Sequence, residues 1–298
     1  AAGANTVTSS TAAVNAMLPA VISGFGPDVA LNITQTEPVN YALRNAVVDL
    51  KAEFGSEVDQ VLSEYYPSSY ESYKFNGGLF ALPETQNYNV MFYRTDIMDQ
   101  LGIDVSKVNT WEDVIKILPV LQKNSMSFAI PSVERKINNM TNPDLANYYA
   151  QLYQRGGTLY DEEAMITTID SPEGIEAFEF YTKLFTNYKL EKQYDFANRF
   201  RSGEMPIGVA DYSTFNTLAV FAPEIKGLWN FALMPGMGQE DGSINRATQS
   251  WGTCSMMLRG AKDRNKTDKA WEFMKWWASS KVQATYASEL EAVMGAAA

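Results

Sequence analysis

The chain has 298 residues, 46% of them hydrophobic and 20% charged, a composition that suits one large or two smaller globular domains and excludes a disordered chain. Its 24 basic and 35 acidic residues give a net charge of −11, which disfavours binding to the phosphate backbone of nucleic acids. No apolar run approaches the roughly 20 residues that a membrane-spanning helix needs.

The sequence contains no histidine and a single cysteine, Cys254. Without imidazole, a Ser-His-Asp triad, a Cys-His dyad and a histidine-containing zinc site are all excluded. Carboxylate chemistry, as in glycosidases, remains available to an enzyme. Phosphate-binding loops and calcium-loop spacings are also missing, so the sequence predicts no metal and no cofactor.

Short apolar stretches alternate with helical patterns along the chain, which predicts an α/β protein. Most of these stretches are flanked by Gly, Pro, Asn or Asp, as strand ends usually are. The predicted strands are Val29–Ile33, Leu79–Leu82, Val90–Tyr93, Phe128–Ile130, Ile207–Ala210, Phe231–Met234 and Cys254–Leu258.

Three helix starts are well marked between the predicted strands. Thr110 precedes two acidic residues and an apolar repeat at helical spacing, and Ser171-Pro172 places a cap before a proline at the first helical position. Thr267 opens a third helix, whose predicted apolar side is Ala270, Phe273, Met274 and Trp277. Trp271 and Trp276 lie off that side and are expected to pack against a neighbouring element.

Several motifs in a fixed order resemble those of the family 1 extracellular solute-binding proteins of ABC transporters, the group that includes maltose-binding protein. The matching segments are Gly26–Val29, Asn76–Pro83, Met91–Asp96, Thr110–Asp113, Gly208–Tyr212 and Thr267–Trp277. Together they extend over nearly the whole chain.

The resemblance implies a periplasmic-binding-protein-like type II fold, in which crossing strands join two α/β lobes and a ligand binds in the cleft. One lobe would comprise residues 1–88 plus 236–298, and the other residues 89–235. Members of the family normally have further elements before and after the matching region, so the chain is expected to be trimmed at both ends.

The same resemblance implies a function and partners. The chain would be a monomeric, non-catalytic receptor that closes around a mono- or oligosaccharide and delivers it to ABC permease subunits. Its location would be the extracellular face of the cell membrane, with a lipid anchor, or the periplasm.

Polar and aromatic side chains at strand ends are the candidate ligand contacts, because a sugar offers apolar C–H faces and a rim of hydroxyls. Thr36 and Glu37 follow the first predicted strand, and Tyr41 lies one helical turn further on. In doubly wound sheets, ligands bind beyond the carboxyl ends of strands. Thr36 and Glu37 are equally compatible with capping the next helix.

A second group of candidates lies at the predicted crossings and in the second lobe. Glu84, Thr85 and Asn87 follow Pro83, and Asp211 and Tyr212 follow the strand Ile207–Ala210. Trp251 stands where the chain should re-enter the first lobe, as either a stacking platform or a core residue. Among Tyr148, Tyr149 and Tyr153, we expect two core residues and one that reaches the pocket, and Tyr148 is the candidate.

Two functions from different classes therefore remain open from the residues alone. One is a binding receptor, and the other is a carbohydrate-active hydrolase in which Glu84 and Asp211 form the pair of carboxylates that glycosidases need. The resemblance favours the receptor.

Overall fold

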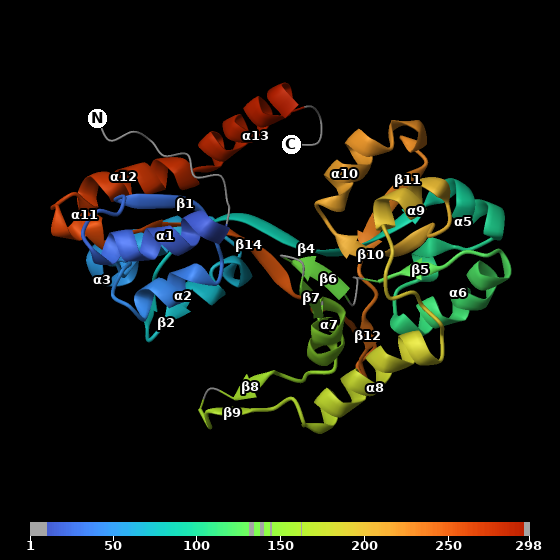
Figure 1. Ribbon diagram of the computed structural model, residues 1–298. Coiled ribbons are helices and arrows are strands. Elements are labelled where there is room, and N and C mark those ends of the chain that lie inside the picture. Colours follow the sequence, from blue (N-terminus) through green and yellow to red (C-terminus); the bar gives the residue numbers. More distant parts are fainter. Residues whose placement is uncertain (1–10, 131–133, 138–139, 144, 162, 295–298) are drawn as a thin grey trace. The chain divides into compact units, whose positions relative to one another are not determined.

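Strands and helices alternate along the chain in the computed structural model, which describes residues 11–130, 134–137, 140–143, 145–161 and 163–294 (Figure 1). The predicted α/β class is confirmed. The chain divides into two units, the first made of the residues up to Gln86 together with Trp251–Val293, and the second of Asn87–Ser250.

The first unit is built around β1 (Val29–Thr34), which pairs antiparallel with β14 (Ser250–Met257). The start of β4 (Leu82–Arg94) lies on the other side of β14. Its remaining elements are α1 (Thr11–Ile22), α2 (Glu37–Ala42), α3 (Leu50–Phe54), α4 (Ser56–Leu62), η1 (Pro67–Ser69), η2 (Glu71–Tyr73), β2 (Lys74–Phe75), β3 (Gly78–Leu79), α11 (Arg259–Asp263), α12 (Thr267–Ala278) and α13 (Ser280–Met294).

One apolar core holds the first unit together. It joins Val21 of α1, Ile33 of β1, Leu50 of α3, Met256 of β14 and Met274 of α12, all of them buried. Because these side chains come from both parts of the chain, the segment after Trp251 completes a core that the first 86 residues begin.

In the second unit, the later part of β4 lies between β10 (Ile207–Asp211) and β11 (Trp229–Leu233), antiparallel to both, and β5 (Phe128–Ala129) runs parallel to β10. The other elements are α5 (Thr95–Leu101), η3 (Val105–Lys107), α6 (Trp111–Lys123), β6 (Glu134–Ile137), β7 (Met140–Pro143), α7 (Ala146–Gln154), β8 (Tyr160–Asp161), β9 (Ile166–Thr167), α8 (Pro172–Thr186), α9 (Phe196–Ser202), α10 (Thr214–Phe221), η4 (Pro223–Ile225), β12 (Met237–Gly238) and β13 (Ile244–Asn245).

Helices cover both faces of this second sheet, because successive side chains of a strand point to opposite faces. Met91 of β4 packs in a cluster with Trp111 of α6, whereas its neighbour Phe92 packs with Phe200 of α9 and Leu218 of α10. A sheet buried on both sides explains why the later part of β4, Val90–Tyr93, reads as a continuous apolar run.

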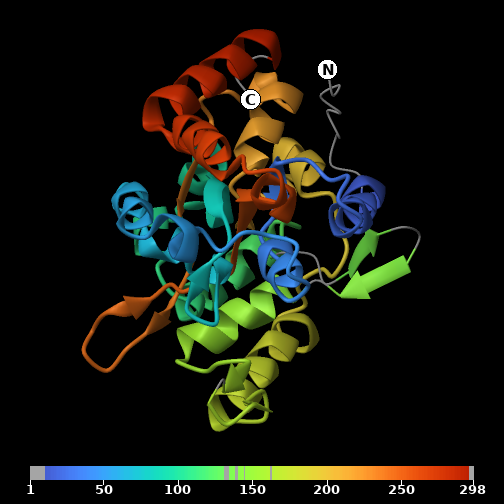
Figure 2. The same cartoon turned by 90° about the vertical axis from the view of Figure 1, so that its left-hand side faces the viewer.

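The second boundary between the units differs from the sequence prediction, which assigned residues 236–250 to the first lobe. The hairpin of β12 and β13, drawn in orange in Figure 2, belongs to the second unit. Asn245 donates to the backbone carbonyls of Tyr153 and Gln154, and Arg246 donates to Asn109. Those bonds hold the segment to α7 and to the start of α6. Asn87 and Tyr88, also predicted in the first lobe, fall just inside the second unit.

Most predicted strands appear in the structure with altered limits. The stretch Leu79–Leu82 is divided between β3 and β4, since Phe80 and Ala81 lie outside both strands. The stretch Val90–Tyr93 is part of the much longer β4. Polar residues occupy the middle of that strand, and a search for apolar runs does not detect them.

The predicted helix starts are confirmed. Ser171 caps α8 by accepting a hydrogen bond from the Gly174 N–H at 3.1 Å, and α12 begins at Thr267. The predicted apolar side of α12 is wrong in part, because its buried residues are Ala270, Trp271 and Met274, while Phe273 is exposed. Trp271 stacks on Phe54 of α3, as expected, but Trp276 is 56% exposed.

None of the helices within the described ranges is both long and apolar enough to cross a membrane.

A capping box fixes the start of α6. The Thr110 hydroxyl accepts from the Asp113 N–H at 3.2 Å, and the Asp113 carboxylate accepts from the Thr110 N–H at 3.0 Å. Burial opposes ionisation of Asp113, but hydrogen bonds from Lys116, Thr110 and the Asn109 N–H outweigh it and lower its pKa to about 2. The ionised carboxylate therefore stabilises the folded state.

Replacing Asp113 by Asn should lower the free energy of unfolding at pH 7 by about 1 kcal/mol, the usual cost of losing a helix cap. Since the folded-state pKa is depressed, this contribution is present above the unfolded value of 3.8 and is lost as the pH falls toward about 2. Urea unfolding of both proteins at pH 7 and near pH 3 measures the difference. Asp99→Asn, on the exposed face of α5, is the control. An equal loss of unfolding free energy at both pH values would contradict the role of the ionised Asp113 carboxylate.

Candidate functional site

The carboxyl end of β1 and the first residues of β14 and β4 meet in the first unit. Thr34 pairs with Thr253 in the strand register, and the Gln35 N–H donates to the Gly252 carbonyl at 3.3 Å. A side chain at Gly252 would collide with the backbone carbonyl of Thr85. The absence of a Cβ atom at this position therefore lets β4 approach β14 closely.

A pair of threonine hydroxyls connects the two strands at this point. The Oγ1 atoms of Thr85 and Thr253 lie 2.9 Å apart, and Thr85 Oγ1 also accepts from the Thr253 N–H at 3.1 Å. Thr85 is exposed. The structure thus places a predicted site residue on the surface with its hydroxyl held in one position.

Glu84 connects β4 to two other elements of the unit. One carboxylate oxygen accepts from the Asn32 N–H at 2.7 Å, and the other accepts from the indole N–H of Trp277 at 2.7 Å. The β1–β14 register shifts between Ala30 and Ile33, and Asn32 has a φ of 54°. This bulge turns the Asn32 N–H out of the strand ladder and toward the carboxylate.

The charge of Glu84 is stabilised less well than these bonds suggest. Burial raises the pKa of the carboxyl group, and the hydrogen bonds from Trp277, Asn32 and Thr253 only partly offset it. Because both oxygens already accept bonds from the protein, the carboxylate positions β1 and the end of α12. Trp277 is a residue that the sequence analysis assigned to packing alone, and no motif marked it as a donor to Glu84.

The residues predicted after β1 lie in different environments. Thr36 is exposed at the N-cap of α2 and makes no capping bond with its side chain, and Glu37 is half-buried and accepts from the Asn40 side chain at 3.1 Å. Tyr41 is fully buried in the core of the unit, and burial, with the Glu37 charge, raises its pKa to about 12. Its predicted role as a ligand contact is therefore corrected to packing.

Trp251, the predicted platform, is half-buried at the beginning of β14 beside Gly252. This intermediate burial is compatible with both interpretations that the sequence offered, a stacking platform and a core residue.

In the second unit, an aromatic stack forms where β4 and β10 lie side by side. Asp211 pairs with Asn89 in the register, and the Tyr212 N–H donates to the Tyr88 carbonyl at 2.9 Å. The rings of Tyr88 and Tyr212 are stacked with centroids 6.0 Å apart and planes 15° apart. They are 42% and 39% exposed, so both side chains are partly accessible from the solvent.

Two phenylalanine side chains pack against Tyr212 of this stack. Phe215 stacks on Tyr212 with centroids 6.1 Å apart, and Phe231 contacts Tyr212 edge-on at 5.5 Å. Beside the rings, Asp211 is half-buried and accepts a hydrogen bond from the Ser213 hydroxyl, and Asn87 is half-buried with its side-chain oxygen bonded to the Tyr88 N–H. Tyr88 was missed because the predicted strand began only at Val90.

Tyr148, the remaining candidate, belongs to the interior of the second unit. It is 4% exposed and packs edge-on against Phe178 and Tyr181 of α8. Its predicted role at the pocket is therefore corrected to packing, and Tyr149 and Tyr153 of the same helix are half-buried.

A separate surface hollow of about 550 Å³ lies at α9 and contains none of the predicted site residues. Its charged side chains pair with one another or with neighbours, as Arg199 does with Glu204 and Arg201 with Glu224. The described part of the chain contains no cluster of three His, Cys, Asp or Glu side chains that could hold a metal ion.

An arabinooligosaccharide-binding protein of Halalkalibacterium halodurans is 25% identical over 133 residues, which cover 45% of this chain and 28% of that protein. The matched region thus spans less than a third of that curated relative.

Solved structures share the fold at low sequence identity. The sugar-binding protein MalE of Xanthomonas citri superposes with a TM-score of 0.76 at 17% identity, covering 96% of this chain and 69% of that one. A solute-binding protein of an ABC transporter from Thermotoga lettingae, bound with α-D-tagatose, gives a TM-score of 0.69 at 19% identity and covers 93% of this chain and 69% of that one. These similarities confirm the predicted type of fold.

Residues 5–293 match the family described as bacterial extracellular solute-binding protein. That match covers almost the whole sequence and agrees with the resemblance seen in its motifs. The chain therefore belongs to the bacterial extracellular solute-binding protein family.

Proposed function

We propose that the chain is the carbohydrate-binding receptor of an ABC importer and that it binds without catalysis. The observation that carries the proposal is the stack of exposed rings formed by Tyr88 and Tyr212. Aromatic faces pack against the apolar C–H faces of a sugar, while short polar side chains bind its hydroxyls. Asn87 and Asp211 supply such groups next to the rings.

The first unit supplies a second set of polar groups for the same purpose. Thr85 presents a fixed hydroxyl, and Thr36, Glu37 and the ring of Trp251 lie near the ends of the strands that meet there. Relatives named for binding an arabinooligosaccharide or crystallised with tagatose support a saccharide as the solute. Delivery to a membrane permease, a monomeric state, lipid anchoring and closure of two lobes on the solute all stay predictions.

The hydrolase alternative has less support. Glu84, its candidate acid, has both oxygens bonded to protein donors, and Asp211 accepts a bond from Ser213. A glycosidase needs one carboxyl that is ready to donate a proton to the leaving group and a second that acts on the sugar or on water. Release of new reducing ends from an oligosaccharide panel, abolished in Glu84→Gln, would overturn the receptor assignment.

A thermal-shift screen tests the proposed function directly. A saccharide at 100 times its dissociation constant should raise the stability of the folded chain by about 2.7 kcal/mol, because it binds the folded state alone. The panel should contain arabino- and malto-oligosaccharides, tagatose and, as controls, amino acids and polyamines. Shifts produced by the controls but by no saccharide would contradict carbohydrate binding.

The ring stack gives a prediction for one substitution. Tyr212→Ala should weaken binding of the best saccharide by about 1 to 3 kcal/mol, the scale of losing one large apolar contact, as measured by isothermal titration calorimetry. Tyr160→Ala is the matched control, since Tyr160 is also an exposed tyrosine of the second unit at 45% but lies on the β8–β9 hairpin. Equal affinities of wild type and Tyr212→Ala would show that the ring stack is not part of the saccharide-binding site.

Glu84 is proposed as a positioning residue. Its replacement by Gln separates its effect on saccharide affinity from its effect on the stability of the folded state. The amide offers one acceptor oxygen in place of two, so either Asn32 or Trp277 loses its partner and saccharide affinity should fall about fivefold, or ~1 kcal/mol. Stability should respond differently. Because burial raises the folded-state pKa of Glu84, the stability due to its neutral form is present below the unfolded-state value of 4.5 and is lost as the pH rises through the folded-state pKa.

Wild type should therefore lose stability relative to Glu84→Gln as the pH rises above 4.5, while the affinity of the variant stays lower than that of wild type. Urea unfolding and calorimetric titration between pH 4 and pH 7 measure both quantities. A variant that loses affinity and stability in parallel at every pH would assign Glu84 to structure alone.

A further inference from the structure

A row of four aromatic rings extends from α12 onto α13, the last two helices in Figure 1. The ring centroid of Trp276 lies 5.7 Å from that of Phe273 and 6.3 Å from that of Trp277. Tyr286 of α13 meets Trp277 edge-on, with centroids 5.2 Å apart. Phe273, Trp276 and Tyr286 are 38%, 56% and 48% exposed. Single apolar side chains are common on protein surfaces, but a contiguous row of large ones marks a binding surface.

Trp277 joins this row to the candidate site of the first unit. Its indole N–H donates to the Glu84 carboxylate at 2.7 Å, so the orientation of the half-buried ring is fixed. The Tyr65 hydroxyl lies 3.3 Å from the Pro83 carbonyl oxygen and 3.4 Å from that of Ala278. These contacts hold the end of α12 beside the start of β4, the strand that carries the candidate residues of this unit.

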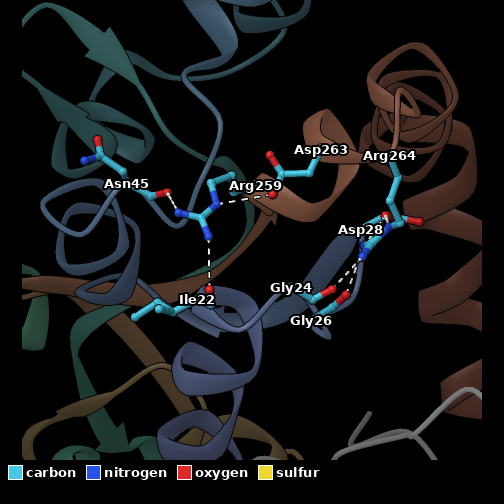
Figure 3. A network of polar contacts seen from close by, with 8 residues as sticks. All are labelled: Ile22, Gly24, Gly26, Asp28, Asn45, Arg259, Asp263 and Arg264. Carbon is cyan, nitrogen blue, oxygen red and sulfur yellow. Dashed lines mark hydrogen bonds and ion pairs between the residues drawn. The ribbon is translucent and has the colours of Figure 1, made fainter.

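Both ends of α12 are attached to the rest of the unit. Just before the helix, Arg264 donates to the Gly26 carbonyl at 3.0 Å and forms an ion pair with Asp28 (Figure 3). Just after it, the Gln283 side chain donates to the Trp277 carbonyl at 2.7 Å and ties the first turn of α13 to the end of α12. Rings that stand on fixed elements lose little freedom when a ligand binds, which favours affinity.

The kind of occupant is inferred from the groups that accompany the rings. Along α12, Glu272 and Lys275 directly precede Phe273 and Trp276, and on β4 the exposed hydroxyl of Thr85 follows Glu84. The core of a protein–protein interface is depleted in charged residues. A sugar, by contrast, suits flat rings edged by charged groups and hydroxyls, because its C–H faces are apolar and its hydroxyls point outward from the rim.

We propose that Trp276, Trp277 and Tyr286 form a second sugar subsite and that the solute is therefore an oligosaccharide, an inference that rests on the proposed function. One sugar unit engages the polar groups at Thr85, and the following unit packs on the row. Three neighbouring rings, with centroid spacings of 6.3 Å and 5.2 Å, present a surface longer than one sugar ring. A single sugar cannot use the row and the Thr85 hydroxyl together.

Isothermal titration calorimetry of the full-length protein with saccharides of two lengths tests the subsite. The probes are arabinose and arabinotriose, and glucose and maltotriose, with thermal shift used where a monosaccharide binds too weakly for calorimetry. Wild type should bind at least one trisaccharide more tightly than the matching monosaccharide. Trp276→Ala should weaken binding of that trisaccharide about tenfold, as loss of an aromatic contact does, and leave binding of the monosaccharide unchanged.

Three further variants make the result specific to the rings. Tyr286→Ala should show the same selective loss, and Trp276→Phe, which keeps an aromatic ring, should stay within about twofold of wild type. Tyr66→Ala is the matched control, because Tyr66 is an 82% exposed aromatic residue of the same unit outside the row. The melting temperatures of all four variants without ligand should equal that of wild type.

Different outcomes separate this subsite from the proposed function. Wild type that binds the monosaccharides as tightly as the trisaccharides would overturn the second subsite. Unchanged trisaccharide affinity in both Trp276→Ala and Tyr286→Ala, or an equal loss for both lengths of saccharide, would do the same and leave the proposed function standing. A lower melting temperature with unchanged affinities would assign the row to packing and also overturn the subsite. If wild type bound no saccharide, the proposed function would fail and the subsite with it.

Discussion

The strand β4 is the constraint on which the rest of the structure depends, because one continuous stretch of 13 residues contributes to both units. Leu82 is buried in the first core, and Met91 and Phe92 are buried in the clusters of the second. Between them, residues 84–88 are half-buried or exposed. Side chains in that middle part are held in place by a strand fixed at both ends, yet they remain available for function. Glu84, Thr85, Asn87 and Tyr88 all lie there.

Polar groups at the candidate site are positioned by other polar groups more than by packing. The bulge in β1 releases the Asn32 N–H, the Glu84 carboxylate accepts it, and Trp277 approaches the same carboxylate from α12. In the second unit, packing contributes more, since Phe215 and Phe231 support the ring of Tyr212. The two units thus hold their candidate residues by different physical means.

Much of the fold was predictable from local patterns, whereas less of the site was. The helix starts at Thr110 and Ser171 depend on side-chain caps that lie within four residues, so the sequence displays them directly. Tyr41 and Tyr148 looked like site residues because a tyrosine at helical spacing does not show which face the fold buries. Trp277 was missed because its partner, Glu84, lies 193 residues away in the sequence. Long-range pairings of this kind leave no local signal.

Gly252 has a consequence for how the region where β4 and β14 meet can change. Its backbone touches the Thr85 carbonyl so closely that no larger residue fits without moving β4. Changes to this region that leave both strands in place must therefore be made in the side chains on either side, Trp251 and Thr253, and in those carried by β4 itself. Any larger residue at position 252 would require a different path for β4 beside β14.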